Sequence, residues 1–428
     1  MSLTVYAEFN QPAFTPQKIV VVGLGYIGLP TAAALAQAGH SVIGVDVNPR
    51  VVEAVNKAQS HIVEPGLDEL LEAAVGGGRL SASTEMPTAD AYLIAVPTPV
   101  GHDDARTPDL SYVFAATQAI APVLERGALV VLESTSPVGA TGQVIERLAA
   151  ARPDLKFPAP GRPESEIDID VVYSPERVIP GKTIQELSTN ARALGGATPR
   201  AALRAARLYR SLTSGELLLT DDRSAEMVKL VENAFRDVNI AFANELSVVC
   251  DKIGLNVWEV IALANHHPRV KILQPGPGVG GHCIAIDPWF IVAQAPEEAR
   301  LIRTAREVND AKPHFVIDKV RQALETMARE GKPDARVGCL GLTFKPDVDD
   351  YRESPSLEIG RELSRLFPGR VVCADPFEAM LTERDGLTMV ATHAALACDV
   401  VVGLVGHREF RTQPRPAGVV VDACGIWA

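Results

Sequence analysis

Cysteine is scarce in this sequence, and no cysteine stands in a paired motif. The six cysteines of the 428 residues show no CxxC spacing, so no disulfide framework is expected, and a reducing cytoplasm is the predicted location. No apolar run approaches the ~20 residues that cross a bilayer, and the first residues lack a secretory signal pattern. Positive charge is also in deficit, with 41 Lys and Arg against 53 Asp and Glu. We therefore expect neither membrane nor nucleic-acid binding.

Apolar strand patterns alternate with helical stretches in two separate parts of the chain. The first part begins at Lys18 with KIVVVGLGYIG, and the second includes RVGCLGLTF and GVVVDACG. Between them, residues 224–254 form one long helical pattern without proline. The order predicts two Rossmann-like doubly wound α/β domains joined by a central helical domain. The expected divisions are a leader over 1–16, then domains over 17–216, 217–312 and 313–428.

A glycine turn follows the first strand. Gly23, Gly25 and Gly28 form GxGxxG at the head of a helix, and Asp46 ends the next strand. Such glycines let backbone N–H groups approach a pyrophosphate, and the acid accepts hydrogen bonds from a ribose. The pattern predicts an NAD site. Arg50 is expected to lie flat on the adenine, although a cation at this position could also accept the 2′-phosphate of NADP. A turn needed only for packing is the alternative.

The long central helix carries Lys229, Asn233 and Arg236 on one face, at steps of four and three residues. A solvated polar stripe is the plain interpretation of such a face. The neighbouring residues are mostly apolar, however, and an amide between two cations is unusual in an exposed stripe. A functional role and a solvated stripe therefore both remain open at this point.

Cys283 follows a stretch dense in glycine and proline over 275–281. Backbone in such a turn can approach a ligand closely, which favours a nucleophilic cysteine. Asp287 precedes Pro288 as the expected start of a helix, a capping role that is compatible with a catalytic one. A small core residue or a metal ligand are the alternatives for Cys283. Since His282 and Cys283 lack the second pair that zinc requires, no metal is predicted.

A polar loop leaves the first strand of the last domain and contains Lys345 and Arg352. The end of a strand in an open α/β sheet is where ligands bind, and two cations there suit a diphosphate. A surface turn with balancing charges is the alternative.

Together these residues resemble the UDP-sugar 6-dehydrogenases of the UDP-glucose/GDP-mannose dehydrogenase family, from about residue 18 to the end. The closest likeness is to the branch that acts on UDP-N-acetylhexosamines, and it is carried by YSPERVIPG at 173–181, the segment 265–290 and FKPDVDDYRESP at 344–355. The UDP-glucose branch typically has a GGSC turn ending in Lys-Asp. Here the turn is GGHC and Ile286 precedes Asp287, which disfavours UDP-glucose.

The resemblance implies a role for each matching position. The implied NAD contacts are Tyr26, Ile27, Asp46, Thr98, Thr135 and Arg352. The implied substrate contacts are Arg177, Val178, Lys229, Asn233, Arg236, Gly280, Phe344 and Lys345. His267 and Arg269 match positions that reach the site of a neighbouring subunit, so a homodimer or larger homo-oligomer is implied. Cys283 matches the family's nucleophile, and Glu176 and Asp287 match carboxylates with catalytic roles.

The implied reaction oxidises C6 of the sugar to a carboxylate with two NAD, through a thiohemiacetal and a thioester on Cys283. Lys229 would take the hydroxyl proton or steady the alkoxide, and Lys229 with Asn233 would stabilise the negative oxygen at each tetrahedral stage. The substrate that the resemblance implies is UDP-N-acetyl-D-mannosamine, and the alternatives are UDP-N-acetylglucosamine or UDP-glucose. A β-hydroxyacid dehydrogenase would yield one NADH and leaves Cys283 unexplained, and a non-enzymatic NAD-binding regulator would need only the first domain.

Overall fold

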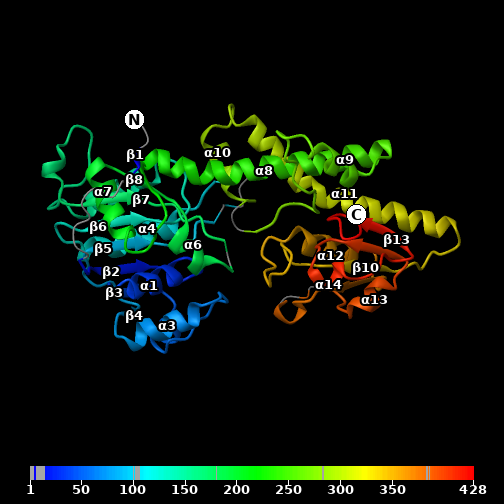
Figure 1. Cartoon of the computed structure of the whole chain (residues 1–428), viewed down its shortest axis with the longest axis horizontal. Coiled ribbons are helices and arrows are strands. Elements are labelled where there is room, and N and C mark those ends of the chain that lie inside the picture. The colour runs from blue at the N-terminus through cyan, green and yellow to red at the C-terminus, as the bar shows by residue number, and fades with distance from the viewer. Residues whose placement is uncertain are drawn as a thin grey trace. The chain divides into compact units, whose positions relative to one another are not determined.

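The structure is a computed structural model that describes residues 4–5 (backbone only), 15–99, 101, 107–179, 181–281, 284–381, 384 and 386–428. The chain forms two compact units, residues 1–231 and 232–428, and each is described by itself (Figure 1). Each unit contains a sheet with helices packed against it, mostly parallel in the first unit and wholly parallel over the described strands of the second, which confirms the predicted fold class. Over the described ranges, no helix has the length and apolar character needed to cross a membrane.

The first unit is built on a sheet of nine described strands in the order β1-β9-β8-β7-β6-β5-β2-β3-β4. The strands are β1 (Thr4–Val5), β2 (Lys18–Val22), β3 (Ser41–Val45), β4 (Leu80–Ser83), β5 (Ala91–Ile94), β6 (Leu129–Leu132), β7 (Asp170–Tyr173), β8 (Arg192–Gly196) and β9 (Leu217–Asp221). From β4 to β7 neighbouring strands are parallel, and the chain switches direction across the sheet between β2 and β5. In open α/β sheets ligands bind at the carboxyl ends of the strands next to such a switch point.

Helices cover both faces of this sheet. They are α1 (Gly28–Gln37), α2 (Pro49–Asn56), α3 (Leu67–Gly76), α4 (Ser111–Ile120), α5 (Ala140–Ala151), α6 (Thr183–Thr189) and α7 (Pro199–Tyr209). Ile19 and Val21 pack into the core with α1, α3 and α7, whereas Val20 and Val22 pack into the core with α4 and α5. Burial on both faces explains why β2 has an uninterrupted apolar sequence.

The first sheet includes strands on either side of the expected 17–216 range. β9 runs parallel to β8, and β1, inside the expected leader, pairs antiparallel with β9. β9 is only five residues long and passes directly into the next helix. Because no turn residues separate them, the sequence gives little signal for this strand.

The second unit begins inside the long helix α8 (Asp222–Ile253), close to the predicted 224–254. The other helices are α9 (Val257–Ala264), α10 (Asp287–Gln294), α11 (Arg300–Arg329), α12 (Pro355–Leu366), α13 (Thr392–Leu396) and α14 (Arg408–Arg411). Four parallel strands follow the order β11-β10-β12-β13: β10 (Val337–Leu340), β11 (Val371–Ala374), β12 (Val400–Gly403) and β13 (Val419–Asp422). α11 continues through Pro313, so the expected division at 312/313 lies within a helix.

A ladder of buried polar side chains joins α8 to α11. Arg306 pairs with Asp237 at 2.6 Å, and the Asn309 amide donates to the Asp237 carboxylate at 2.8 Å. Two turns further along α8, the Asn244 amide donates to Asn309 at 2.8 Å, and its oxygen accepts from the Gly276 N–H. The two helices therefore hold the start of the glycine-rich turn.

Candidate active site

The glycine turn after β2 has the geometry of a dinucleotide site. Gly23 has φ +91°, and a Cβ there would lie 2.6 Å from the Ala95 carbonyl oxygen; a Cβ on Gly28 would lie 1.8 Å from that of Gly23. A Cβ on Gly25, in contrast, meets nothing within 4 Å. The first and third glycines are thus required by packing, while the second leaves its backbone open to a ligand. This fits a pyrophosphate at the N-terminus of α1.

Asp46 stands at the end of β3 and organises the same turn. One carboxylate oxygen accepts from the Leu24 N–H at 2.9 Å, and the other accepts from the Asn48 N–H at 2.8 Å. The residue is only half-buried, so its oxygens remain accessible to a ribose hydroxyl. Both the acid and the turn therefore fit NAD.

The other predicted cofactor contacts of this unit gather at the carboxyl edge of its sheet. Thr98 follows β5 and Thr135 follows β6, and both are half-buried. The Ser134 hydroxyl ties the two loops together, accepting from the Val96 N–H at 2.9 Å and donating to its carbonyl at 2.8 Å. Tyr26 and Arg50 are exposed and Ile27 is half-buried. The predicted contact Arg352 belongs to the second unit, where it pairs with Asp350 at 2.5 Å.

Glu176 is held on three sides in the loop after β7. One carboxylate oxygen accepts from the N–H groups of Arg177 at 2.6 Å and Val178 at 3.1 Å. The other pairs with Arg192 at 2.6 Å, and the Glu176 side chain is 8% exposed. The carboxylate thus fixes the backbone of both predicted substrate contacts, Arg177 and Val178.

On α8 the predicted polar residues differ in their surroundings. Lys229 and Asn233 are half-buried, while Arg236 is exposed. The Asn233 amide donates to the Asp287 carboxylate at 2.5 Å, where α10 begins. Asp287 is 2% exposed. The structure therefore brings together two residues that the sequence placed 54 positions apart.

The predicted nucleophile Cys283 and its neighbour His282 lie outside the described residues. The glycines before them are described, and they pack against the loop after β10. A Cβ on Gly280 would lie 2.4 Å from the Glu353 carbonyl oxygen and 3.0 Å from the Phe344 Cβ, and one on Gly281 would meet the Phe344 ring at 3.0 Å. The predicted contacts Gly280 and Phe344 are therefore neighbours, and neither glycine has room for a side chain.

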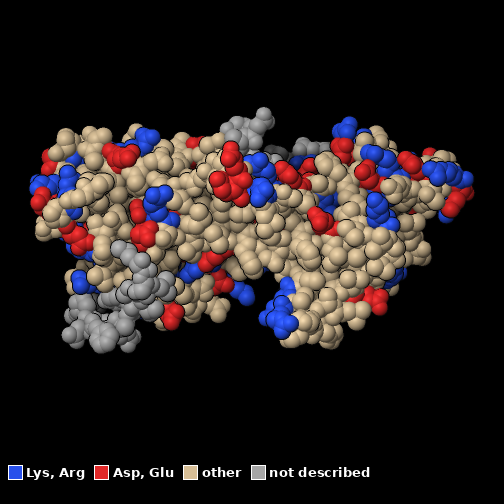
Figure 2. Space-filling model, turned by 90° about the horizontal axis from the view of Figure 1, so that it is seen from above, with Lys and Arg blue, Asp and Glu red and all other residues tan. Residues whose placement is uncertain are grey.

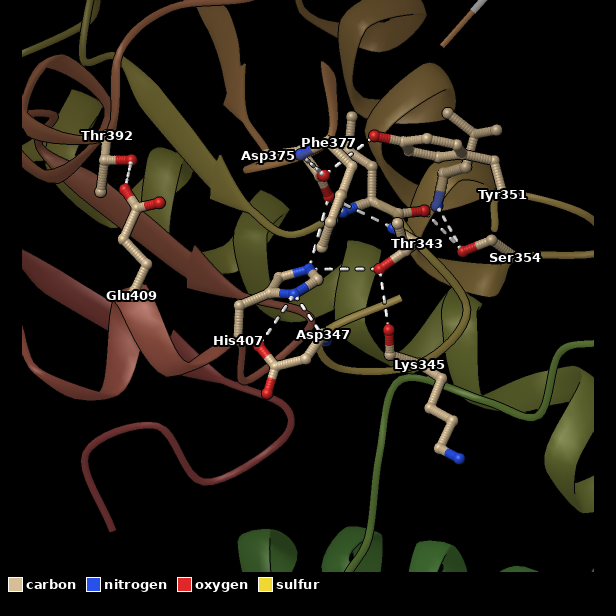
Figure 3. A network of polar contacts seen from close by, with 12 residues as sticks. Thr343, Lys345, Asp347, Tyr351, Ser354, Asp375, Phe377, Thr392, His407 and Glu409 are labelled. Atoms are coloured by element: carbon tan, nitrogen blue, oxygen red, sulfur yellow. Dashed lines mark hydrogen bonds and ion pairs between the residues drawn. The ribbon is translucent and has the colours of Figure 1, made fainter. Parts of the chain in front are cut away.

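The loop after β10 is anchored by buried polar groups (Figure 3). The Asp375 carboxylate, at the end of β11, accepts from the Leu342 N–H at 2.6 Å and the Tyr351 hydroxyl at 2.8 Å. His407 Nδ1 accepts from the Asp347 N–H at 3.0 Å, so Nε2 carries the proton and faces the Thr343 hydroxyl at 3.1 Å. Burial acts to raise the pKa of Asp375, but hydrogen bonds from His407, Leu342 and their neighbours hold it below its usual range.

This network leaves Lys345 available to a ligand. The Thr343 hydroxyl donates to the Lys345 carbonyl oxygen at 3.0 Å, while the Lys345 side chain is exposed and extends away from the network (Figure 3). In the described part of the chain its ammonium group has no carboxylate partner. An exposed ammonium on a fixed backbone suits a phosphate.

Charge elsewhere is dispersed. Figure 2 shows Lys and Arg interspersed with Asp and Glu on the face drawn. His267 and Arg269 are exposed in the segment after α9. Among the described residues, no group of His, Cys, Asp and Glu could hold a metal ion.

Two buried groups near these loops were not predicted from the sequence. Asp375 could have been found, because CADP at the end of β11 repeats the position of Asp46 in GVDVNP at the end of β3. Glu226 on α8 accepts from the N–H groups of Gly139 at 2.6 Å and Thr141 at 2.7 Å, where α5 begins. No local pattern marks Glu226, because its partners lie 85 and 87 positions away.

Known proteins share this organisation. Family models for the UDP-glucose/GDP-mannose dehydrogenase family match residues 17–213 (NAD binding domain), 223–311 (central domain) and 338–428 (UDP binding domain). An NDP-N-acetyl-D-galactosaminuronic acid dehydrogenase of Ralstonia nicotianae is 56% identical over 96% of both chains. A UDP-N-acetyl-D-mannosamine dehydrogenase of Salmonella typhi is 54% identical over 96% of this chain and 99% of its own.

A solved structure agrees over the same length. The UDP-N-acetylmannosamine dehydrogenase of Pyrococcus horikoshii superposes with a TM-score of 0.84 at 37% identity, covering 96% of both chains. NAD is thus the cofactor, and the protein is an oxidoreductase that acts on a UDP-sugar. The chain belongs to the UDP-glucose/GDP-mannose dehydrogenase family.

Proposed function

We propose that this enzyme oxidises C6 of UDP-N-acetyl-D-mannosamine to the carboxylate, giving UDP-N-acetyl-D-mannosaminuronate. The name of the Salmonella relative supports this sugar, as does the GGHC turn. The name of the Ralstonia relative favours a second candidate, a nucleotide-linked N-acetylgalactosamine. Both carry an acetamido group, and both products would suit the synthesis of a surface polysaccharide.

The residues on α8 would assist the first oxidation. The Lys229 ammonium has no ion-pair partner in the described part of the chain, and it stands one helical turn before Asn233. In its neutral amine form Lys229 would receive the C6 hydroxyl proton, and as the ammonium it would steady the alkoxide. When bound, NAD accepts the two electrons removed in each oxidation. Lys229 and Asn233 would stabilise the negative oxygen at each tetrahedral stage, worth about 3–4 kcal/mol per preorganised donor.

Cys283 would retain the aldehyde. Its thiolate adds to the carbonyl carbon and forms a thiohemiacetal; a second two-electron oxidation gives a thioester, and water releases the acid and the thiol. The support is the position of Cys283 in the sequence, directly after a glycine turn packed against Phe344. The hydrogen bond between Asn233 and Asp287 supports a site that includes the residues following Cys283.

The two candidate carboxylates would have different roles. Glu176 is committed to Arg192 and to two backbone N–H groups, so it would position the substrate loop. Asp287 accepts from Asn233, which stands one helical turn after Lys229 on α8, and we assign the orientation of the hydrolytic water to it. The support for this role is its contact with a residue proposed to stabilise the negative oxygen.

A second copy of the chain is the proposed partner of α8. Four large apolar side chains of this helix are exposed: Phe235 (70%), Phe242 (57%), Val249 (47%) and Ile253 (62%). Their spacing of seven, seven and four residues places them on one helix face, as in helix pairing. His267 and Arg269 would then reach the neighbouring site in a homodimer or larger oligomer.

The remaining expectations form part of the same proposal. Residues 17–216 would bind NAD, residues 217–312 would dimerise and residues 313–428 would bind the UDP-sugar. A cytoplasmic location is supported by the described cysteines, which are free thiols even though Cys339 and Cys373 lie opposite each other on β10 and β11.

A panel of UDP-sugars assayed for NADH tests this function. UDP-N-acetyl-D-mannosamine should give the highest kcat/KM, with two NADH per sugar. A Cys283→Ser variant should lose acid formation, while Cys424→Ser, a matched change at a half-buried thiol, should not. One NADH per molecule would instead indicate a single oxidation of the β-hydroxyacid type, and unchanged acid formation by Cys283→Ser would contradict the thioester route.

A further inference from the structure

A buried carboxyl group stands directly behind the Glu176 loop. Glu133 follows β6, and its side chain is fully buried. One carboxylate oxygen accepts from the Tyr209 hydroxyl at 2.5 Å. The other oxygen accepts no hydrogen bond from any residue that the structure describes. An unsatisfied buried carboxylate oxygen is costly, so its retention calls for an explanation.

Arg192 links this group to the predicted substrate loop. Its guanidinium lies 2.6 Å from the Glu176 carboxylate but 3.6 Å from that of Glu133. It also lies over the Tyr209 ring, 4.5 Å from the centroid. The groups that face Glu133 are thus Arg192 from β8, Glu176 from the loop after β7 and Tyr209 from α7. The Arg192 guanidinium therefore lies near two carboxyl groups, and of the two only that of Glu176 is within hydrogen-bond distance.

We propose that Glu133 is a positioning residue, which acts through Arg192 to set how firmly Glu176 holds the backbone of Arg177 and Val178. When Glu133 is protonated, Arg192 pairs with Glu176 alone and the loop is held in place. When Glu133 is ionised, it attracts Arg192 and weakens that hold. The inference rests on the proposed function, because it takes Arg177 and Val178 as substrate contacts.

The electrostatics place this exchange near neutral pH. Burial raises the pKa of Glu133 to about 7, against the opposing effect of Arg192 and with a further increase from Glu176. The hydrogen bond from Tyr209 stabilises the ionised form and so lowers the same pKa. Loss of the Tyr209 hydroxyl should therefore move the transition to higher pH.

The test is the KM for UDP-N-acetyl-D-mannosamine at saturating NAD, measured from about pH 6 to about pH 8.5. The wild-type KM should rise about threefold or more across this range. Glu133→Gln should remove the step and keep the low-pH KM throughout. Tyr209→Phe should keep the step but move it to higher pH. Glu166→Gln, an exposed carboxylate of the same unit, should match the wild type, and the KM for NAD should not follow the step.

Three results separate this inference from the function on which it rests. A Glu133→Gln enzyme that keeps the wild-type step overturns the role of Glu133, as does a Tyr209→Phe step that is not displaced. If Glu133→Gln does not fold, the displacement in Tyr209→Phe decides alone. If Glu176→Gln leaves the KM for the sugar unchanged, the assignment of the substrate loop in the proposed function fails instead.

Discussion

The two sheets of this enzyme have the same hydrogen-bonded aspartate at their carboxyl ends, but the two aspartates differ in burial. In each, an aspartate at the end of the second strand accepts from a backbone N–H after the first strand: Asp46 from Leu24, and Asp375 from Leu342. Asp46 is half-buried, but the Asp375 side chain is fully buried. Asp375 also receives hydrogen bonds from Tyr351 and the Phe377 N–H.

The difference teaches how one fold can bind two nucleotides. An acid with accessible oxygens can recognise a ribose, whereas an acid whose oxygens are saturated can only hold a loop. In the first unit the glycine turn passes directly into α1, and the ligand completes the site. In the second unit the long loop from Gly341 to Ser354 carries the proposed ligand contacts Phe344 and Lys345, and Asp375 with His407 fixes that loop.

The largest expected difference between the two units is in the free energy of unfolding after each aspartate is replaced by asparagine. Asp375→Asn places an amide N–H₂ among donors that need acceptors, so we expect a loss of about 2–4 kcal/mol in the free energy of unfolding. Asp46→Asn should cost less than about 1 kcal/mol, since Asp46 is only half-buried and its hydrogen bond with the Asn48 N–H is exposed. Urea unfolding of the two variants measures both values. Equal losses would remove the distinction between the two acids.

For ligand affinity the order should be reversed, because Asp46, unlike Asp375, has accessible oxygens. Asp46→Asn should raise the KM for NAD about tenfold, because a charge-assisted hydrogen bond to the ribose is weakened, and should leave the KM for the UDP-sugar unchanged. Lys345→Met should raise the KM for the UDP-sugar about tenfold with no effect on NAD. Lys332→Met, at another exposed lysine of the second unit, is the control. If either variant raised the KM for NAD and the KM for the UDP-sugar equally, the assignment of one ligand to each unit would be wrong.

The pH dependence of stability should also differ between the units. The pKa of Glu133 is raised from 4.5 to about 7, so its contribution is fully present below pH 4.5 and is lost as the pH rises through about 7. The pKa of Asp375 is lowered from 3.8, so its contribution is present above that value and is lost as the pH falls below it. Hydrogen exchange from pH 4 to 8, resolved by unit, should show the first unit weakening with rising pH. Glu133→Gln should reduce that slope, and the slope that stays would come from Glu226 and Asp222, whose pKa values burial also raises.

The smallest effect concerns Lys312, which is 5% exposed on α11 and donates to the Ser247 hydroxyl. Burial lowers its pKa from 10.5 to about 8, so the folded state binds the proton less tightly than the unfolded chain does. Lys312→Met should stabilise the protein at pH 7 by about 1 kcal/mol. That gain should shrink as the pH rises from about 8 to 10.5. A stability loss at pH 7 would show that the Ser247 contact outweighs desolvation.

Sequence reasoning predicted those parts of the candidate site that depend on local spacing. The turn from Gly23 to Gly28, Asp46 and the helical face of Lys229 and Asn233 are each set by backbone periodicity, so they could be predicted. Glu133, Arg192 and His407 could not, because each meets its partners only after the sheet has formed. The edge strand β1 and its neighbour β9 were missed for a related reason, since β1 has only two residues and β9 passes directly into α8 with no turn between them.

The contact of Gly280 with Phe344 and the Glu353 carbonyl limits how this enzyme can diverge. Any side chain added to the turn would displace both the segment leading to Cys283 and the loop that carries Lys345. With the roles proposed for Cys283 and Lys345, a mutation there would disturb chemistry and nucleotide recognition at once. New preferences among sugars are more easily acquired through side chains that contact only the hexose, and such changes would leave this interlocked pair of loops intact.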